Sequence, residues 1–218
     1  MDPSLLDLPG LPESDLPESL LAALPASTPS PPWHCRVRAL VWVQRGQVPL
    51  PDDTRFDGRA LPLVLGAFVD YLDSPVGPYR EVFAGPVVAR RGLPAVHVPF
   101  IAVDSLPSVH GGRAHWGLPK ALATFDGDLG SDGDVAAVGD GWSVRARTGS
   151  RGVPVPLAGT FANTQAAGWA RVVLRGRGRL VGVDVTGSGP TLSGWLGTGT
   201  HVGVVASGRM VVHPARPE

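Results

Sequence analysis

The sequence contains few or none of several features, and each absence argues against a class of protein. It has a single cysteine, Cys35, so no disulfide can form within the chain, which fits a reducing compartment. No apolar run approaches the roughly 18 residues that a membrane-spanning helix needs. The first residues are acidic and interrupted by proline, unlike the basic and then apolar start of a secretory signal. We therefore expect a soluble, cytoplasmic protein with no membrane partner.

The chain also lacks net charge, because 19 basic residues balance 19 acidic ones. This balance argues against a nucleic-acid partner. Four arginines of the stretch RVVLRGRGRLVG would share one face of a strand: Arg171, Arg175, Arg177 and Arg179. No aromatic residue is interleaved with them, so a solvated strand face or a subunit contact suits them better than nucleic acid.

Lysine is the scarcest basic residue, since Lys120 is the only one beside 18 arginines. An arginine side chain stays protonated at physiological pH, whereas a buried lysine amine can lose its proton and attack a carbonyl to form a Schiff base. Lys120 is therefore a candidate nucleophile. The alternative is chance, in which a skewed genome converted most lysine codons to arginine and missed one.

Glutamate is almost as scarce in the body of the chain. Three of the four glutamates lie near the N-terminus or at the last residue, and only Glu81 lies between them. A carboxylate can position a substrate or move protons beside an amine nucleophile, provided that the fold brings the two groups together. Glu81 and Lys120 are thus a candidate catalytic pair, although both counts are small enough for chance.

The order of segments predicts two parts. Residues 1–32 form a Pro-rich N-terminal arm with one short helix in DLPESLLAAL, capped by Asp15. This arm would pack on the body or on a neighbouring subunit, and a disordered tail is the alternative. Residues 33–218 form the main domain.

Residues 33–218 alternate in strand-like runs separated by turns, and the chain has 29 glycines and 23 prolines. The predicted class is mainly antiparallel β (α+β), closed or nearly closed, with an interior cavity and a few short helices. One helix is expected in DSLPSVHGG, capped by Asp104 and ended by the two glycines.

No metal site is predicted. His110 and His115 are five residues apart, which does not put them on one helical face. The stretch DGDLGSDGDV contains several carboxylates without the ligand spacing of a calcium loop, and a hairpin turn explains it better. Those carboxylates are Asp126, Asp128, Asp132 and Asp134.

Two motifs resemble those of the acetoacetate decarboxylase superfamily: YRE at residues 79–81 and GRAHWGLPKA at residues 112–121. The resemblance extends over roughly residues 33–213. It implies an acetoacetate decarboxylase-like, cone-shaped β-barrel in residues 33–218, with short peripheral helices and homo-oligomeric assembly. By position, Lys120 falls on the Schiff-base lysine and Glu81 on an acidic residue of the active site.

The resemblance also implies substrate-binding residues. An arginine that holds a substrate carboxylate would correspond to Arg36 or Arg38, which share one face of an early strand, and Arg36 is preferred. Tyr79, Arg113 and Trp116 belong to the two motifs and are expected to contact the substrate. Arg113 would also supply positive charge near Lys120 if it folds inward.

The sequence departs from the family pattern at three places. The second lysine of the family motif is Ala121, its glutamate is Ala114, and an upstream active-site glutamate has no counterpart, since only Leu65 or Gly66 aligns there. The resemblance therefore implies imine chemistry more strongly than it implies acetoacetate as the substrate.

We predict a Schiff-base-forming lyase, either a decarboxylase or an aldolase or dehydratase, that acts on a small oxo acid through Lys120. No cofactor is required, because the iminium serves as the electron sink. This hypothesis needs Arg36, Glu81 and Lys120 to share one cavity. The alternatives are a non-catalytic small-molecule-binding barrel of the same fold and, more weakly, a structural partner in an oligomer.

Overall fold

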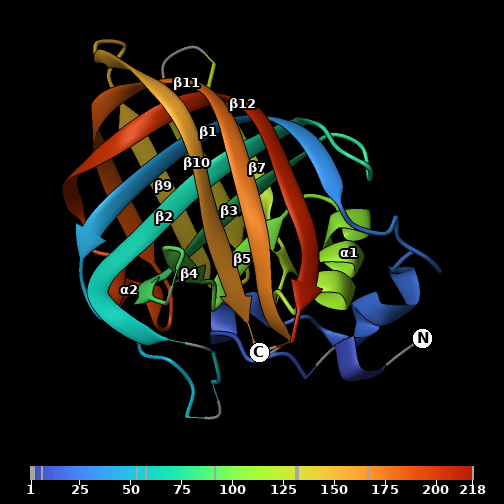
Figure 1. Ribbon diagram of the computed structural model, residues 1–218. Helices are drawn as coiled ribbons and strands as arrows, with labels where there is room; N and C mark the ends of the chain where they lie inside the picture. Colours follow the sequence, from blue (N-terminus) through green and yellow to red (C-terminus); the bar gives the residue numbers. More distant parts are fainter. Residues whose placement is uncertain are drawn as a thin grey trace.

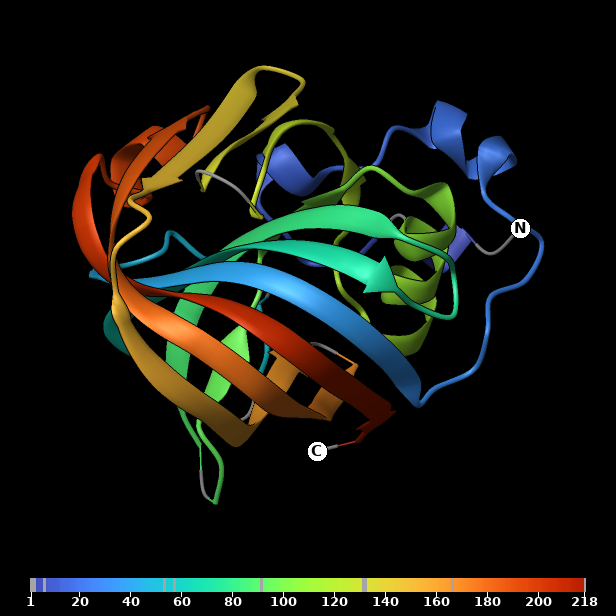
Figure 2. The same ribbon diagram turned by 90° about the horizontal axis from the view of Figure 1, so that it is seen from above.

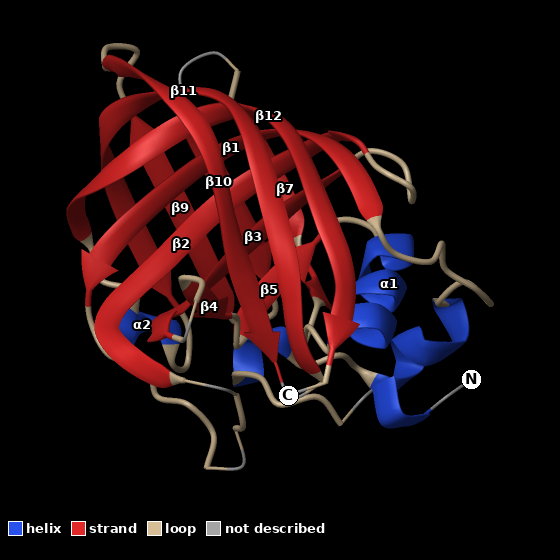
Figure 3. Ribbon diagram, in the orientation of Figure 1, coloured by secondary structure: helices blue, strands red, loops and turns tan. Residues whose placement is uncertain are grey.

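The computed structural model describes residues 3–5, 7–52, 54–56, 58–90, 92–130, 133–165 and 167–217. The strands are β1 (Trp33–Arg45), β2 (Arg59–Asp73), β3 (Tyr79–Ala89), β4 (Ala95–His97), β5 (Phe100–Val103), β6 (Ala121–Leu122), β7 (Thr124–Asp128), β8 (Asp134–Gly139), β9 (Trp142–Thr148), β10 (Val153–Gln165), β11 (Gly168–Ser188) and β12 (Gly199–Arg216). The helices are the 3-10 helices η1 (Pro3–Leu5), η2 (Pro12–Ser14) and η3 (Glu18–Ala23) and the α-helices α1 (Leu106–Trp116) and α2 (Leu192–Trp195). Figure 3 shows how far strands outweigh helices, and the predicted class is confirmed.

The sheet closes on itself. Strand β10 pairs with β11 on one side and with β4 on the other, so β10, β4, β3, β2, β1, β12 and β11 form a closed ring. Every pairing in the ring is antiparallel except β10 with β4. Figures 1 and 2 show these strands wrapping round a common interior. This curved, closed sheet corresponds to the cone-shaped barrel that the resemblance implied.

The two faces of the ring bury different clusters. The interior cluster draws residues from β1, β2, β3, β4, β11 and β12 of the ring and from α1, among them Cys35, Tyr71, Tyr79, Trp116 and Met210. The outer cluster lies where β7, β8 and β9 pack on the outside of the ring, and it includes Leu40, Trp42 and Val82. Because side chains alternate along a strand, neighbouring residues of β1 and β3 belong to different clusters.

Helix α1 contacts β12 and β11 of the ring, and also β5 and β6, which lie off the ring beside β3. The expected cap was wrong: Ser105 caps α1, and its Oγ accepts from the backbone N–H of Ser108 at 3.3 Å. The expected end was also wrong, because the helix continues past the two glycines to Gly117, whose φ of 65° needs a residue without a Cβ. Asp104 instead accepts a hydrogen bond from the backbone N–H of Arg80 at 2.7 Å.

The described part of the N-terminal arm packs on the body. Leu5, Leu16 and Leu24 belong to the interior cluster. Glu13 is 4% exposed and accepts hydrogen bonds from Thr191, including its backbone N–H. The short helix of the arm is η3, but it starts after Pro17 and has no side-chain cap, so the expected role of Asp15 was wrong.

In the described residues, no helix is both long enough and apolar enough to cross a membrane.

Candidate active site

A buried ion pair occupies the interior of the ring. Lys120 Nζ lies 2.7 Å from Glu81 Oε2, and the two side chains are 4% and 5% exposed. The ammonium also donates to Ser108 Oγ at 3.0 Å and lies 5.2 Å from the centre of the Tyr79 ring. The fold therefore brings together the two rarest charged residues of the body of the chain, which is the contact that a catalytic pair requires.

Local structure explains how the pair is held. Strand β3 directs Tyr79 and Glu81 to the interior, and Arg80 and Val82 to the opposite face. Lys120 follows the left-handed turn at Gly117 and directly precedes β6. Its aliphatic chain lies against Gly112 of α1, where a Cβ would come within 2.5 Å of Lys120 Cδ. Glycine at position 112 thus leaves room for the lysine side chain against α1.

Sequence patterns missed three neighbours of this pair: Tyr71, Ser108 and Cys35. Tyr71 Oη donates to Glu81 Oε1 at 3.1 Å, and its ring stacks on that of Tyr79 with centroids 4.1 Å apart. Ser108 is fully buried and accepts from Lys120. These residues come from β2, α1 and β1, and the pairing of β1 with β2 and of β2 with β3 places Cys35 and Tyr71 on the same side of the sheet as Glu81.

The surroundings of Glu81 hold nearby acidic groups in their neutral forms. Burial raises the pKa of Tyr71 and Tyr79 well above the ordinary tyrosine value, and the charge of Glu81 adds to the shift. Burial likewise raises the pKa of the Cys35 thiol to about 12, with a further contribution from Glu81. Cys35 is buried and unpaired, as expected for an inert cysteine.

Arg113 folds inward, yet its donors are used by the backbone. It donates to the carbonyl oxygens of Lys120 at 2.8 Å, Leu5 at 2.6 Å and Ser14 at 3.0 Å. Burial lowers the pKa of its guanidinium to about 10. Arg113 therefore ties the N-terminal arm to the lysine segment, because backbone carbonyl oxygens accept from three of its five N–H donors.

Trp116 belongs to the interior cluster, packs edge-on against Trp33 with ring centroids 4.9 Å apart, and donates to the carbonyl oxygen of His213 at 2.9 Å.

Arg36 and Arg38 are not in the interior. Cys35 and Val37 belong to the interior cluster, so the arginines that alternate with them point to the outer face. Arg36 is exposed, and Arg38 forms an ion pair with Asp128 at 3.1 Å. The shared parity predicted for the two arginines is correct, but neither shares a cavity with Lys120.

The described residues contain no group of three or more His, Cys, Asp and Glu that could hold a metal ion. The stretch DGDLGSDGDV is largely a hairpin in which β7 pairs with β8, and Asp132 lies outside the described residues. Two of its carboxylates are engaged by arginines: Asp128 by Arg38, and Asp134 by Arg145 at 2.6 Å. Neighbouring arginine hydrogen bonds lower the pKa of Asp134.

Comparisons with known proteins concern the sequence and the fold. A family model described as acetoacetate decarboxylase matches residues 50–146, a range that contains both Glu81 and Lys120. This match covers less than half of the chain, and over that range the sequence resembles acetoacetate decarboxylase, as the two motifs predicted. No curated protein matches the sequence.

Three solved structures show the shared fold. The acetoacetate decarboxylase of Legionella pneumophila subsp. pneumophila str. Philadelphia 1 is 16% identical, with a TM-score of 0.62 over 88% of this chain and 91% of that one. The enduracididine biosynthesis enzyme MppR, complexed with pyruvate, is 19% identical, with a TM-score of 0.59 over 88% and 91%. An acetoacetate decarboxylase-like enzyme from Sphingomonas wittichii RW1 is 15% identical, with a TM-score of 0.56 over 85% and 92%.

Two departures from the superfamily pattern can now be located. Ala114 is exposed on α1, so a longer acidic side chain there would start from the solvent side of the helix. Ala121 is 5% exposed in β6, next to the lysine, and pairs with Ala102 of β5. The buried pair therefore lacks a second lysine beside it, and Glu81 is the charged group closest to Lys120.

Proposed function

We propose that this protein is an enzyme of the Schiff-base lyase type, in which Lys120 forms an imine with a small carbonyl substrate. The supporting observation is the buried pair itself, with Lys120 Nζ 2.7 Å from Glu81 Oε2. A carboxylate in direct contact with the only lysine can take the ammonium proton and free the amine as a nucleophile.

The proton then has a defined route. Glu81, protonated by the ammonium, returns the proton to the hydroxyl of the carbinolamine, which leaves as water and produces the iminium. The iminium accepts the electron pair of a bond that breaks at the adjacent carbon, giving an enamine. The group that leaves is carbon dioxide in a decarboxylation, an aldehyde in a retro-aldol cleavage, or a proton in the first step of an aldol addition. Protonation of the enamine and hydrolysis of the imine then release the product and restore the pair. Tyr71 would orient Glu81 through its hydrogen bond of 3.1 Å during both transfers.

For the substrate we propose a small oxo acid, with pyruvate as the first probe because the related MppR is seen complexed with pyruvate. The requirement that Arg36 share a cavity with Glu81 and Lys120 is not met, because Arg36 and Arg38 both point to the outer face. The proposal therefore rests on Lys120 and Glu81 alone, and the substrate carboxylate would be received by interior hydroxyl groups. Tyr71, Tyr79 and Ser108 carry the hydroxyls nearest the pair. We therefore expect weaker selection for a carboxylate than a bidentate arginine would provide.

A non-catalytic binding barrel is the second candidate, and the position of the arginines favours it. An oxo acid that finds no cation other than Lys120 could be held without being turned over. The two candidates differ in whether a covalent imine forms at Lys120.

Borohydride trapping tests the proposal. The intact protein is incubated with pyruvate and, separately, with acetaldehyde as a neutral carbonyl probe, then reduced and analysed by mass spectrometry and peptide mapping. We expect a stable adduct on Lys120 with at least one probe and none there in Lys120→Arg, which keeps the charge and removes the nucleophile. Because the chain has one lysine, only the N-terminal amine contributes background.

Folded wild-type protein that gives no adduct at Lys120 with either probe, from neutral to alkaline pH, would contradict imine chemistry. Saturable binding of pyruvate without an adduct would support the binding barrel instead.

A further inference from the structure

The outer face of the ring carries a group of arginines that the proposed chemistry does not use. In the register of β1, β12 and β11, Arg36, Arg209 and Arg175 are direct neighbours, as are Arg38, Ser207 and Arg177. Arg179 follows in the next row, beside Val205 and Leu40. Directly paired residues project to the same side of a sheet, so these side chains share one face. We call this set the arginine face: Arg36, Arg38, Arg175, Arg177, Arg179 and Arg209.

The arginine face is poorly neutralised. Within the described part of the chain, its only ion pair joins Arg38 to Asp128 at 3.1 Å, and Arg179 donates to the carbonyl oxygen of Ser150. Arg209 lies directly between two other arginines, on neighbouring strands. Like charges opposite one another weaken a sheet, so the bare protein carries a cost that a bound anion would relieve.

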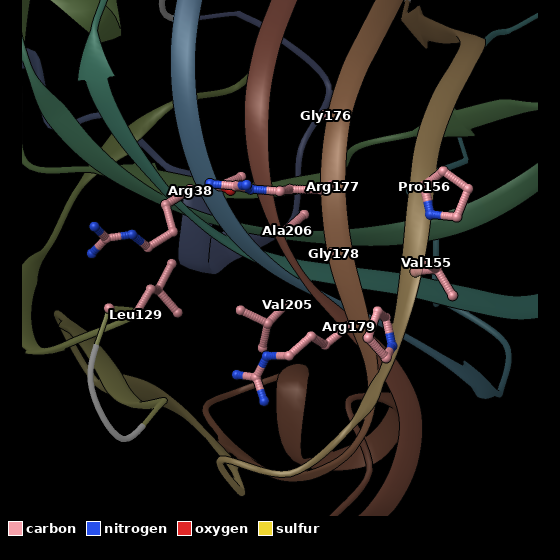
Figure 4. Close-up of a pocket in the computed structure, with 13 residues that line it drawn as sticks. Arg38, Leu129, Val155, Pro156, Gly176, Arg177, Gly178, Arg179, Val205 and Ala206 are labelled. Carbon is pink, nitrogen blue, oxygen red and sulfur yellow. The ribbon is translucent and has the colours of Figure 1, made fainter.

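A groove lies on this face. It has a volume of about 600 Å³ and lies among β1, β10, β11, β12 and the turn at Leu129 and Gly130. Figure 4 shows the side chains of Arg177 and Arg179 extending from β11 on the side where Arg38 and Leu129 lie. The rest of the lining is largely apolar or small, and it includes Leu129, Pro154, Val155, Pro156, Val205 and Ala206.

We propose that this groove binds a small molecule that carries at least two negative oxyanion charges, phosphate or carboxylate, on a partly apolar body. Arginine presents a planar fork of donors that matches both kinds of oxyanion. Arg177 and Arg179 are two residues apart on one strand, so their Cα atoms are separated by about 7 Å, which suits two charges on one small ligand. A volume of about 600 Å³ lies within the usual range for small-molecule sites.

Two other occupants fit the groove less well. Single-stranded nucleic acid is held by aromatic side chains on which bases stack, and the lining contains no Phe, Tyr or Trp. A second copy of the chain would have to bring acidic side chains to the arginine face. The acidic side chain already paired there, Asp128, comes from the same chain. A small anion needs neither feature.

The groove is tested by isothermal titration of the full chain with inorganic pyrophosphate and with citrate, at constant ionic strength. We expect saturable binding of at least one of them to the wild type. In the double variant Arg177→Gln/Arg179→Gln the affinity should fall at least tenfold. The matched control Arg45→Gln, an exposed arginine at the far end of β1, should change affinity less than twofold.

Three results would overturn the proposal: no saturable binding of either anion by the folded wild type, equal loss of affinity in the control, or an effect that follows ionic strength alone. Size-exclusion chromatography and titration with a single-stranded oligonucleotide identify the other occupants. Loss of an oligomer in the double variant, or tight oligonucleotide binding, each without binding of either small anion, would assign the face to a subunit contact or to nucleic acid. Lys120 takes no part in these measurements, so their failure leaves the proposed imine chemistry untouched.

Discussion

The two faces of β1 carry opposite chemistry. Toward the interior, Cys35 and Val37 are 5% and 3% exposed and pack around the buried pair. Toward the outside, Arg36 and Arg38 contribute to the arginine face. One face of β1 thus lines a buried ion pair, and its other face belongs to a surface of arginines that are mostly without ion pairs in the described residues. This is possible because side chains alternate along the strand and the ring separates its two sides.

The ion pair inside the ring and the ion pair outside it should differ in the same way in what they contribute to the free energy of unfolding. The pair of Lys120 and Glu81 is almost fully withdrawn from water, whereas the side chains of Arg38 and Asp128 are 33% and 57% exposed. Solvent screens the outer pair, so it contributes little to stability. The inner pair is costly to break, since either partner alone would be a buried charge.

The largest effect on stability is expected when a charged residue replaces an apolar one on the interior face of β1, and a much smaller one when the reverse is done on the outer face. Val37→Arg places an unpaired charge in the interior cluster, and we expect loss of folding or a destabilisation of more than about 4 kcal/mol. Arg38→Val on the other face should change the free energy of unfolding by about 1 kcal/mol or less. Urea denaturation followed by circular dichroism measures both, and similar losses would contradict the assignment of the faces.

Removing one partner from each ion pair gives the next largest difference. Glu81→Gln leaves the Lys120 amine buried without its counter-charge and should destabilise the protein by about 3–5 kcal/mol. Asp128→Asn should cost less than about 1 kcal/mol. The double variant Glu81→Gln/Lys120→Met should recover most of the loss, because no buried charge remains. If the two single variants lose equal stability by urea denaturation, the inner pair is not buried in solution.

His97 shows that the ring also buries a titratable group away from the pair. It is 1% exposed, stacks on Phe56, and has its pKa lowered by burial from 6.5 to about 4. In the unfolded chain His97 binds a proton below about pH 6.5, whereas in the folded chain it does so only below about pH 4. Stability is therefore complete above that window and falls by up to about 3 kcal/mol as the pH drops through it.

Urea denaturation at a series of pH values from 4 to 7 measures this pH dependence of the free energy of unfolding. His97→Asn should make the free energy of unfolding less dependent on pH in this range, and an unchanged dependence would contradict the role given to His97.

The contact between Gly112 and Lys120 offers a finer test. Gly112→Ala introduces a Cβ within 2.5 Å of Lys120 Cδ, so the lysine must shift from Glu81. We expect imine trapping to slow by about tenfold, since misplacement of a reacting group is costly. Gly159→Ala is the matched control, because a Cβ there meets nothing within 4 Å. Equal trapping rates in the two variants would show that the position of Lys120 does not matter.

The smallest expected effect concerns the arginine face. Arg209→Gln removes the middle charge of a row of three and should raise the free energy of unfolding by a few tenths of a kcal/mol at low salt. The gain should vanish at about 1 M salt, where the Debye length is about 3 Å. Arg45→Gln serves as the control in the same denaturation series. A loss of stability in Arg209→Gln at low salt would show that the like charges do not repel appreciably.

The strand pattern and the scarcity of two residues carried much of the prediction. Alternation identified antiparallel β structure, and the rarity of lysine and glutamate pointed to Lys120 and Glu81 before any contact was known. The same alternation correctly put Arg36 and Arg38 on one face. It could not say which face encloses the site, because both faces of β1 are buried along much of its length.

Other parts of the site left no usable pattern in the sequence. Tyr71 meets Glu81 across ten residues through the pairing of β2 with β3, and Ser108 meets Lys120 across twelve through the turn between α1 and β6. Arg113 was expected to serve the site, yet carbonyl oxygens of the distant N-terminal arm take two of its donors. Backbone acceptors of this kind carry no residue-type signal, so sequence alone does not reveal them.

By itself, the sequence determined which side chains of each strand share a face, and it singled out one lysine and one glutamate as the unusual charges of the body of the chain. Tertiary structure decided which of those faces lies inside the ring, and so it brought Lys120 to Glu81 and turned Arg36 and Arg38 outward. The physical reason is that alternation is a property of each strand, whereas inside and outside exist only after β10 has joined β4 to β11 and closed the sheet.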